Sequence, residues 1–383
     1  RNGSGWTTAV SEWYPNGTTD TGMSKTQYTN FDAFGRPGTI TLPDSKAVTL
    51  AYTGVRQLQR TVSVATSTTS ETTATTTEVY DRQGRLYQLT EPSGSGGANV
   101  TTTYAYDVGS RLHSTSTTSG STTQTRAFTY DNRGFLTSEQ LPEKGASGNG
   151  SVTYSSYDSR GHVGAITDGP NNRSYTYDRA ERLTNVRITS GNSLIDLAYA
   201  SANGLGDYAN GKLRTATRHN WISGVDNQVV ETYTYGGTGG AASQRATTAE
   251  GQSVSQGFTW TDLGLPGSVT YPQIAGIGPA RTVSDVYTFG FLTSVPSYAT
   301  GITYSVNAMP YRITHTNNVV ATYGLDGNNI QRIAGVTTTG ASSNNLALTP
   351  FAYDGAGDVK AIGGQTFVYD KVSRLVTGNI LAN

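Results

Sequence analysis

The chain has 383 residues, no cysteine, 46 glycines and equal numbers of basic and acidic residues, 27 of each. The lack of cysteine excludes disulfides, thiolate zinc sites, iron–sulfur clusters and cysteine nucleophiles. Zero net charge argues against a protein that binds the phosphates of nucleic acids regardless of sequence. The absence of an 18-residue apolar run predicts no membrane-spanning helix.

The first 27 residues carry no clear pattern, and we expect an irregular lead-in or the end of a preceding repeat there. From residue 28 onward, aromatic residues alternate with small ones, as in Tyr104-Ala105-Tyr106 and Tyr175-Thr176-Tyr177. Residues two apart lie on one face of a β-strand. No stretch of twelve residues has a convincing helical period. The sequence therefore predicts an all-β protein with almost no helix.

A tyrosine–aspartate pair ends many of the predicted strands and recurs along the chain. Roughly 15 copies about 24 residues apart predict a repeat array over 28–377, followed by a truncated end at 378–383. The clearest copies begin at Tyr80, Tyr106, Tyr130, Tyr157, Tyr177, Tyr353 and Tyr369, with a Phe-Asp copy at Phe31 and weaker ones at Tyr52, Tyr199, Tyr235, Trp260, Phe289, Tyr304 and Tyr323.

Each copy is predicted to be a β-hairpin. The aspartate opens a turn by accepting hydrogen bonds from backbone N–H groups ahead of it. A glycine four residues after the aromatic can supply a positive φ, and an Arg-Leu pair begins the return strand. The repeat residues are Asp81, Gly84, Arg85, Leu86, Asp107, Asp131, Gly134, Asp158, Gly161, Asp178, Asp354, Gly357 and Asp370, with further turn glycines at Gly35, Gly264 and Gly327.

A second, variable turn is expected between copies, where Gly, Ser, Thr and Asn are frequent. These segments are 66–77, 93–99, 114–125, 145–150 and 236–242. One hairpin cannot bury its own face, so the copies must stack edge to edge. The predicted fold is a repeat array of antiparallel hairpins that forms a curved β-spiral or shell-like wall. We expect its repeat aromatics to be mostly buried and structural.

The repeated tyrosine–aspartate pattern resembles the YD-repeat, or Rhs (rearrangement hot spot), family over about residues 28–377. That family includes shell proteins of toxin complexes, wall-associated bacterial toxins and teneurins. The resemblance implies a hollow β-spiral shell, secreted or at the bacterial cell surface, that encloses a toxin polypeptide. Bacterial members close the shell with an Asp-Pro-rich core that often cleaves the toxin free. This sequence has no Asp-Pro dipeptide, so the resemblance transfers neither proteolysis nor toxicity.

Other patterns favour structure over chemistry. Residues 206–213 resemble a phosphate-binding loop but end in Leu213 where a magnesium-binding hydroxyl is needed. Residues 354–358 hold two aspartates in a Gly-rich turn without the further ligands of a calcium loop. The four histidines are expected to be isolated: His113, His162, His219 and His315. The sequence thus predicts no catalytic, cofactor or metal site.

The leading interpretation is a non-catalytic structural module of an Rhs-type shell. Its partners would be the remainder of a larger parent chain or an enclosed toxin polypeptide. The alternative is an extracellular adhesion, carbohydrate-binding or filament-forming β-repeat protein, with glycans as ligands or end-to-end self-assembly. An enzyme hidden in the 199–235 segment is the weakest option, because so short a stretch cannot hold an active-site domain.

Overall fold

The computed structural model describes residues 1–14, 16–94, 96–145, 150–188, 191–274, 276–328, 330–340 and 345–379. These residues form β-strands and two short 3-10 turns, η1 (Asp20–Gly22) and η2 (Thr238–Gly240), and no α-helix. None of the helical segments in the described ranges has the length and apolar character needed to cross a bilayer. The predicted all-β class is confirmed.

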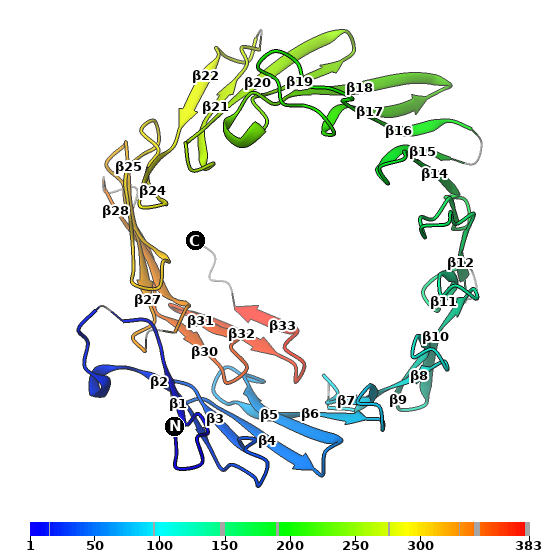
Figure 1. Cartoon of the computed structure of the whole chain (residues 1–383). Helices are drawn as coiled ribbons and strands as arrows, with labels where there is room; N and C mark the ends of the chain where they lie inside the picture. The colour runs from blue at the N-terminus through cyan, green and yellow to red at the C-terminus, as the bar shows by residue number, and fades with distance from the viewer. Residues whose placement is uncertain are drawn as a thin grey trace. The chain divides into compact units, whose positions relative to one another are not determined.

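The chain divides into two compact units, residues 1–126 with 301–383 and residues 127–300. The strands of the first unit, labelled in Figure 1, are β1 (Ala9–Ser11), β2 (Lys25–Thr29), β3 (Thr39–Thr41), β4 (Ala47–Thr53), β5 (Gln57–Val64), β6 (Thr72–Tyr80), β7 (Leu86–Glu91), β8 (Val100–Tyr106), β9 (Leu112–Ser119), β26 (Pro310–His315), β27 (Val320–Leu325), β28 (Ile333–Thr339), β29 (Leu346–Leu348), β30 (Phe351–Tyr353), β31 (Val359–Ile362), β32 (Gln365–Tyr369) and β33 (Leu375–Asn379).

The second unit contains the strands between the two limits, and β10 (Thr122–Tyr130) and β25 (Ala299–Tyr304) each run across one limit. Its own strands are β11 (Leu136–Leu141), β12 (Gly150–Ser155), β13 (Ala165–Thr167), β14 (Arg173–Tyr177), β15 (Leu183–Ile188), β16 (Ser193–Tyr199), β17 (Leu213–Ile222), β18 (Val225–Thr234), β19 (Gln244–Ala249), β20 (Gln252–Trp260), β21 (Pro266–Tyr271), β22 (Arg281–Ser284), β23 (Val286–Thr288) and β24 (Phe291–Ser294).

Within each sheet, strands that follow one another in sequence pair with one another, always antiparallel in the registers described. β1 to β22 belong to one 22-stranded sheet, and β23–β24, β25–β29 and β30–β33 form smaller sheets. Consecutive pairing is what a row of stacked hairpins requires, because each strand needs a hydrogen-bonding neighbour on both sides. The predicted wall of repeated hairpins is therefore confirmed.

The tyrosine–aspartate turn has one backbone geometry in most copies. At Tyr80, the N–H of Asp81 donates to the carbonyl of Arg85 at 2.8 Å, and the N–H of Gly84 donates to the carbonyl of Asp81 at 3.1 Å. Tyr80 then lies opposite Leu86, with a register shift at that point. This is a three-residue hairpin loop with a left-handed residue that forms a bulge, and Gly84 supplies it at φ 79°.

The left-handed position does not always hold glycine. Ser110, Glu181 and Ser373 occupy it in their copies at φ 61°, 67° and 61°. Conversely, the prediction for Gly327 was wrong, since its φ is not positive. In that copy the aspartate follows Leu325, which pairs with Ile333 across a longer turn. The repeat is thus shifted by two residues from the position that Tyr323 suggested.

Two of the predicted variable loops are largely strand. Residues 72–77 belong to β6, and 114–125 form most of a hairpin between β9 and β10. Threonine is β-branched and suits a pleated strand, so a Thr-rich stretch was misassigned as loop. Residues 93–99, apart from the undescribed 95, and 236–242 do connect strands as predicted. Most of 145–150 lies outside the described residues.

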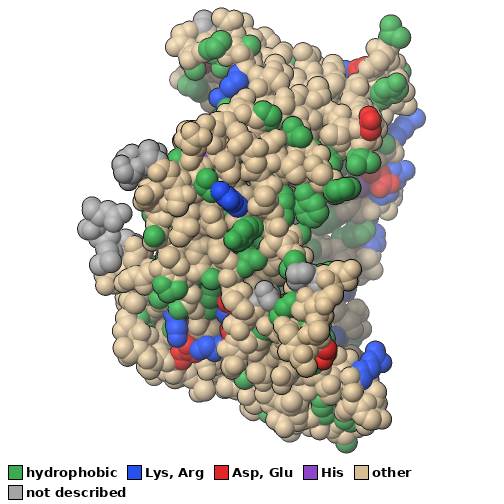
Figure 2. Space-filling model, turned by 90° about the vertical axis from the view of Figure 1, so that its left-hand side faces the viewer, with side chains coloured by type: hydrophobic (Ala, Val, Ile, Leu, Met, Phe, Trp, Pro, Cys, Tyr) green, Lys and Arg blue, Asp and Glu red, His purple; other side chains and the backbone are tan. Residues whose placement is uncertain are grey.

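The repeat aromatics are only partly buried, which corrects the expectation that most of them would be buried. The rings at Tyr80, Tyr106, Tyr130 and Tyr157 all keep an intermediate exposure. Neighbouring repeats cover part of these rings, as the Arg85 guanidinium does for Tyr106. The face drawn in Figure 2 accordingly shows hydrophobic side chains scattered among polar atoms. The buried apolar side chains among the described residues are small: Val64, Ala65, Ala74, Val152, Val186, Ala209, Ala299 and Ala321.

Candidate functional site

Most repeat turns that carry an aspartate are held by a paired aspartate and arginine. The Oδ1 atom of Asp81 accepts the N–H groups of Gln83 and Arg85 at 2.8 and 3.0 Å. Its Oδ2 atom accepts Nε and Nη2 of Arg85, both at 2.7 Å. Partial burial raises the pKa of Asp81, but the hydrogen bonds from Arg85 outweigh it and the pKa falls below its usual value. The predicted turn role of the aspartate is met, and the arginine adds a second attachment.

The same pairing recurs four residues apart along the array. Two copies differ in spacing: Asp131 binds Arg133, two residues on, and Asp326 binds Arg332, six residues on. Asp158 pairs with His162 through Nδ1 at 2.8 Å, and the His162 hydrogen bond lowers the pKa of Asp158 to about 2. The other copies with the four-residue spacing are Asp32–Arg36, Asp107–Arg111, Asp178–Arg182 and Asp370–Arg374.

The arginine also reaches the next repeat. The Arg85 guanidinium lies 4.4 Å from the ring centroid of Tyr106, and the Tyr106 hydroxyl donates to the carbonyl of Leu86 at 2.9 Å. Cation–π contact and hydrogen bond therefore join two consecutive hairpins at one point. We call this succession of contacts the Asp–Arg–Tyr ladder; its other cation–ring pairs are Arg36–Tyr52, Arg182–Tyr199, Lys212–Tyr235 and Arg332–Tyr353.

Two steps of the ladder replace the cation with another planar group. Phe135 stacks on Tyr157 with ring centroids 5.1 Å apart, and His162 stacks on Tyr177 at 4.7 Å. The Tyr157 hydroxyl still donates to the carbonyl of Leu136, at 2.6 Å. The recurring Arg-Leu pair was expected to begin the return strand, and no function was predicted for the arginine. The spacing of Asp and Arg by four residues, repeated after each aromatic, is the signal that could have revealed the ladder.

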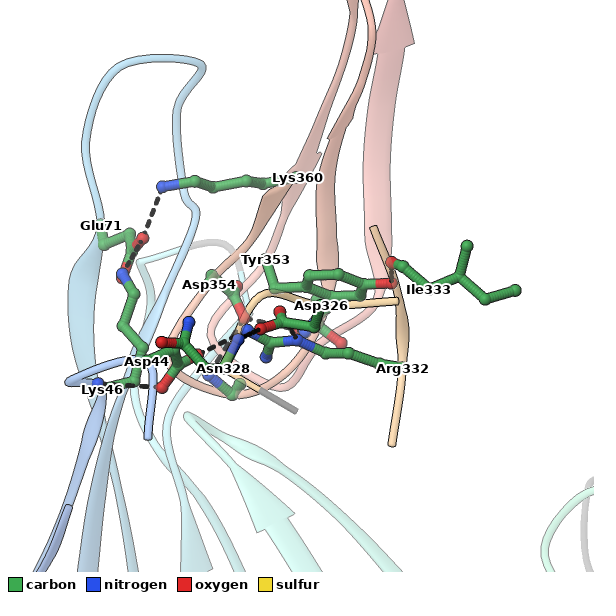
Figure 3. A network of polar contacts seen from close by, with 12 residues as sticks. Asp44, Lys46, Glu71, Asp326, Asn328, Arg332, Ile333, Tyr353, Asp354 and Lys360 are labelled. Carbon is green, nitrogen blue, oxygen red and sulfur yellow. Dashed lines mark hydrogen bonds and ion pairs between the residues drawn. The ribbon is translucent and has the colours of Figure 1, made fainter. Parts of the chain in front are cut away.

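In the first unit, residues of the last repeats contact residues that lie almost 290 positions earlier in the chain. Figure 1 shows β30–β33 beside β5 and β6, and Figure 3 shows the polar side chains between them. Arg332 pairs with Asp326 of its own turn and with Asp44 between β3 and β4, both at 2.7 Å. All three side chains are largely buried. We call the set Asp44, Lys46, Ala65, Glu71, Arg332, Asp354 and Lys360 the long-range contact.

Glu71 is the second attachment in the long-range contact. Its Oε1 atom lies 2.7 Å from Nζ of Lys46 and 2.7 Å from Nζ of Lys360, a residue 289 positions later. Burial raises the pKa of Glu71, but hydrogen bonds from Lys360 and Lys46 outweigh this and lower it. A carboxylate with two ammonium partners keeps its charge in a half-buried place, so the contact is electrostatically satisfied.

Asp354 makes the third attachment and is 1% exposed. Its Oδ1 atom accepts the N–H groups of Ala356 and Asp358, as Oδ1 of Asp81 does with Gln83 and Arg85. Its Oδ2 atom accepts the N–H of Ala65 at 2.8 Å, in place of an arginine. The reason lies in the sequence: Asp358 stands where this turn would carry its arginine. The released carboxylate oxygen binds the backbone of a distant repeat.

Close backbone approach accompanies these polar attachments. The Tyr369 N–H donates to the Ala65 carbonyl at 2.9 Å. A Cβ added to Gly355 would lie 2.9 Å from both Cβ and the carbonyl oxygen of Ser63. A Cβ on Gly94 would lie 2.8 Å from the carboxyl carbon of Asp370. Glycine is needed at position 355 because the backbone of β5 occupies the space of a side chain, whereas at position 94 the side chains of Asp370 and Arg374 fill it.

His219 corrects the expectation of isolated histidines. It lies on β17 with its side chain 8% exposed, and its Nδ1 and Nε2 atoms lie 2.7 and 2.8 Å from carboxylate oxygens of Asp226 on β18 and Asp196 on β16. Only an imidazolium donates from both nitrogens. Desolvation lowers the pKa of His219, but the bonds to Asp226 and Asp196 outweigh it and raise the pKa. The three groups join β16, β17 and β18, and β17 and β18 form a regular hairpin within the 199–235 region.

No grouping of metal-ligating side chains occurs in the described parts of the chain. The three residues around His219 do not form one, because each carboxylate binds a different ring nitrogen. The aspartates of the predicted repeat bind backbone N–H groups and side chains of their turns or of the long-range contact. What the arrangement does chemically is hold hairpins to one another.

Solved structures similar in fold are chains of toxin complexes. A TcdB2-TccC3-Cdc42 structure matches with TM-score 0.58 at 13% identity, and a Photorhabdus luminescens Tc holotoxin pore structure with TM-score 0.66 at 13% identity. Each alignment covers 92% of this chain and 19% of the other chain, so this chain spans about a fifth of the length of those proteins. At this identity the likeness concerns the fold. No family model and no curated protein matches the sequence.

Proposed function

We propose that the chain is a non-catalytic structural module, part of an Rhs-type shell that encloses or presents a polypeptide cargo such as a toxin. The observation that carries the proposal is the Asp–Arg–Tyr ladder. The side chains that recur along the sequence bind the adjacent repeat, so the repeated chemistry builds a wall. The fold likeness to chains of TcdB2-TccC3 complexes supports the same function.

The absence of chemistry is part of the proposal. The turn aspartates Asp81, Asp107 and Asp178 carry arginine partners and have lowered pKa values, which suits a structural carboxylate and not a general acid. A shell subunit also fits a location outside the cell or at its surface. There the remainder of a longer parent chain and the enclosed polypeptide would be the partners.

Protease protection of a cargo tests this function. The parent chain that contains this sequence would be produced with its following polypeptide and treated with a nonspecific protease under native conditions. We expect the following polypeptide to survive at protease concentrations that destroy it when it is produced alone. The control is the same parent with Asp354→Ala, which weakens the long-range contact and should expose the cargo. Equal digestion of free and attached polypeptide would contradict the shell function.

A further inference from the structure

The stretch between Asp262 and Arg312 is poor in charge and rich in exposed apolar side chains. It carries only two charged residues, Arg281 and Asp285, although charged residues make up 14% of the whole chain. Its large side chains are nevertheless open to solvent, among them Tyr271, Ile274, Ile277, Phe289 and Tyr298. Exposed apolar side chains that gather in one place mark an interaction surface.

Several of these side chains belong to the loop between β21 and β22, described at residues 272–274 and 276–280 (Figure 1). The N–H of Ile277 donates to the carbonyl of Ile274 at 3.0 Å, and the N–H of Ile274 donates to the carbonyl of Gly278 at 3.1 Å. The loop is therefore a small hairpin that pairs part of its own backbone, which reduces the cost of moving it out of water. Ile277 is 81% exposed and Ile274 is 41% exposed.

One cation stands at the base of this loop. The Arg281 guanidinium lies 5.4 Å from the ring centroid of Tyr271 and 5.6 Å from that of Tyr298, in the turn that follows β24. Arg281 is exposed, and it forms no ion pair within the described ranges. A groove of about 420 Å³ is lined by Arg281, Tyr271 and the two isoleucines. The loop thus combines an apolar tip, two aromatic rings and one unpaired positive charge.

We propose that this loop docks on a membrane surface that contains anionic phospholipid. Ile274 and Ile277 would enter the boundary of the acyl chains, and the tyrosines would lie at the headgroup level, where such rings are enriched. Arg281 would pair with a lipid phosphate, which matches the geometry of a guanidinium. An uncharged protruding tip above a single cation complements a layer with an apolar interior and an anionic surface. This inference goes beyond the shell function, since it gives the wall a lipid ligand.

Sedimentation of the full chain with vesicles tests the proposal. The vesicles contain equal parts of phosphatidylcholine and phosphatidylglycerol, and phosphatidylcholine alone is the neutral control. We expect about fivefold weaker binding to the neutral vesicles, the value of one arginine near an anionic surface. Arg281→Gln should weaken binding to the mixed vesicles by the same factor and leave neutral binding unchanged. The matched control Arg173→Gln removes an exposed arginine of β14 and should change neither.

A second pair of variants tests insertion of the tip. Ile277→Ser should weaken binding to both kinds of vesicle about tenfold, because one isoleucine no longer leaves water. Its control is Leu263→Ser, in the turn at the other end of β21, which is also 81% exposed and should have no effect. Both side chains are exposed, so the melting temperatures should stay unchanged and the comparison does not depend on folding.

A fluorescent probe locates the tip directly. The chain has no cysteine, so Ile277→Cys accepts a single environment-sensitive dye. We expect its emission to rise and move to shorter wavelength when mixed vesicles are added, and a dye on Leu263→Cys to stay unchanged.

Three results would overturn the proposal: no sedimentation with mixed vesicles, equal losses in Ile277→Ser and Leu263→Ser, or a dye at position 277 that remains in water. Self-association of the chain that Ile277→Ser abolishes, without vesicle binding, would assign the loop to a protein contact and overturn it as well. The vesicle experiment contains no cargo, so its outcome is independent of the protease test of the shell function.

Discussion

The turns at Tyr106 and Tyr353 carry the same aspartate but use it differently. Asp107 binds its own arginine, Arg111, and stays within its hairpin. Asp354 has no arginine in its turn and binds the backbone of Ala65 instead, 289 residues earlier. The difference comes from one residue, Asp358 in place of arginine. A repeat can therefore change from a local contact to a long-range one without changing its backbone.

The largest expected effect is at Asp354. Asp354→Ala leaves the N–H groups of Ala65, Ala356 and Asp358 without their buried acceptor, so we expect a loss of about 3–5 kcal/mol in the stability of the first unit. Asp107→Ala should cost less, because the Asp107 side chain is 21% exposed and water can take the place of its carboxylate. Denaturant unfolding of both variants measures the difference. Equal losses would mean that Asp354 adds nothing beyond an ordinary turn.

Arg332 comes next, because it belongs to the ladder and to the long-range contact together. Arg332→Ala leaves Asp44 and Asp326 unpaired in largely buried positions, which should cost about 2–4 kcal/mol. The matched ladder variant is Arg182→Ala, with a more exposed guanidinium and one acidic partner. We expect about 1 kcal/mol there. A loss at Arg182 that equals the loss at Arg332 would contradict a special role for the Asp44 pair.

Steric closeness gives a third test. Gly355→Ala places a methyl group against the Ser63 backbone, and the resulting shift should cost about 1–3 kcal/mol. Gly357→Ala, two residues on, meets open space and is strained only by its φ of 93°. Hydrogen exchange of the Ala65 and Tyr369 amides should distinguish them. Only the Gly355 variant should speed exchange at Ala65, and unchanged protection there would count against the close approach.

The smallest expected effect is the pH dependence at His219. Its pKa is raised in the folded chain, so the stabilisation is complete below the unfolded value of about 6.5 and disappears as the pH rises through the folded value. The carboxylates of the ladder work in the opposite direction, since their lowered pKa values make stability fall at acidic pH. Thermal melts of the wild type and His219→Gln between pH 5 and 8.5 should converge at the alkaline end. A constant difference would refute the imidazolium clamp.

Sequence patterns predicted the hairpins because the relevant information is local. Tyr80, Asp81 and Gly84 lie within five residues, and backbone geometry dictates which side chains such a turn accepts. The long-range contact could not be predicted in the same way, because nothing in the sequence around Glu71 identifies Lys360 as its partner. One departure from the repeat was nevertheless visible. Asp358 breaks the arginine position, and it marks the turn whose aspartate binds a distant repeat.

The partial burial of the aromatics was mispredicted for a physical reason. Alternating rings on one strand face suggested a packed interior, but Tyr106 keeps an intermediate exposure with the Arg85 guanidinium over its ring. The threonine-rich stretches misled in the other direction. Thr72–Tyr80 is a strand although its composition resembles a linker. Composition alone does not distinguish a threonine-rich strand from a linker. The presence of a hydrogen-bonding neighbour in the sheet does.

The ladder also has a direction. In the cation–ring pairs of the ladder, the cation contacts an aromatic ring that comes later in the chain, as Arg85 contacts Tyr106. The carbonyl of Leu86 likewise accepts a hydrogen bond from the hydroxyl of Tyr106, a later residue. A ribosome releases residues in that same order, so every new hairpin can dock on an edge that is already finished. Asp44, Ala65 and Glu71 differ, because their partners emerge nearly 290 residues later. During synthesis the hairpins can therefore pair one after another. The long-range contact can form only after the last repeats have been synthesised.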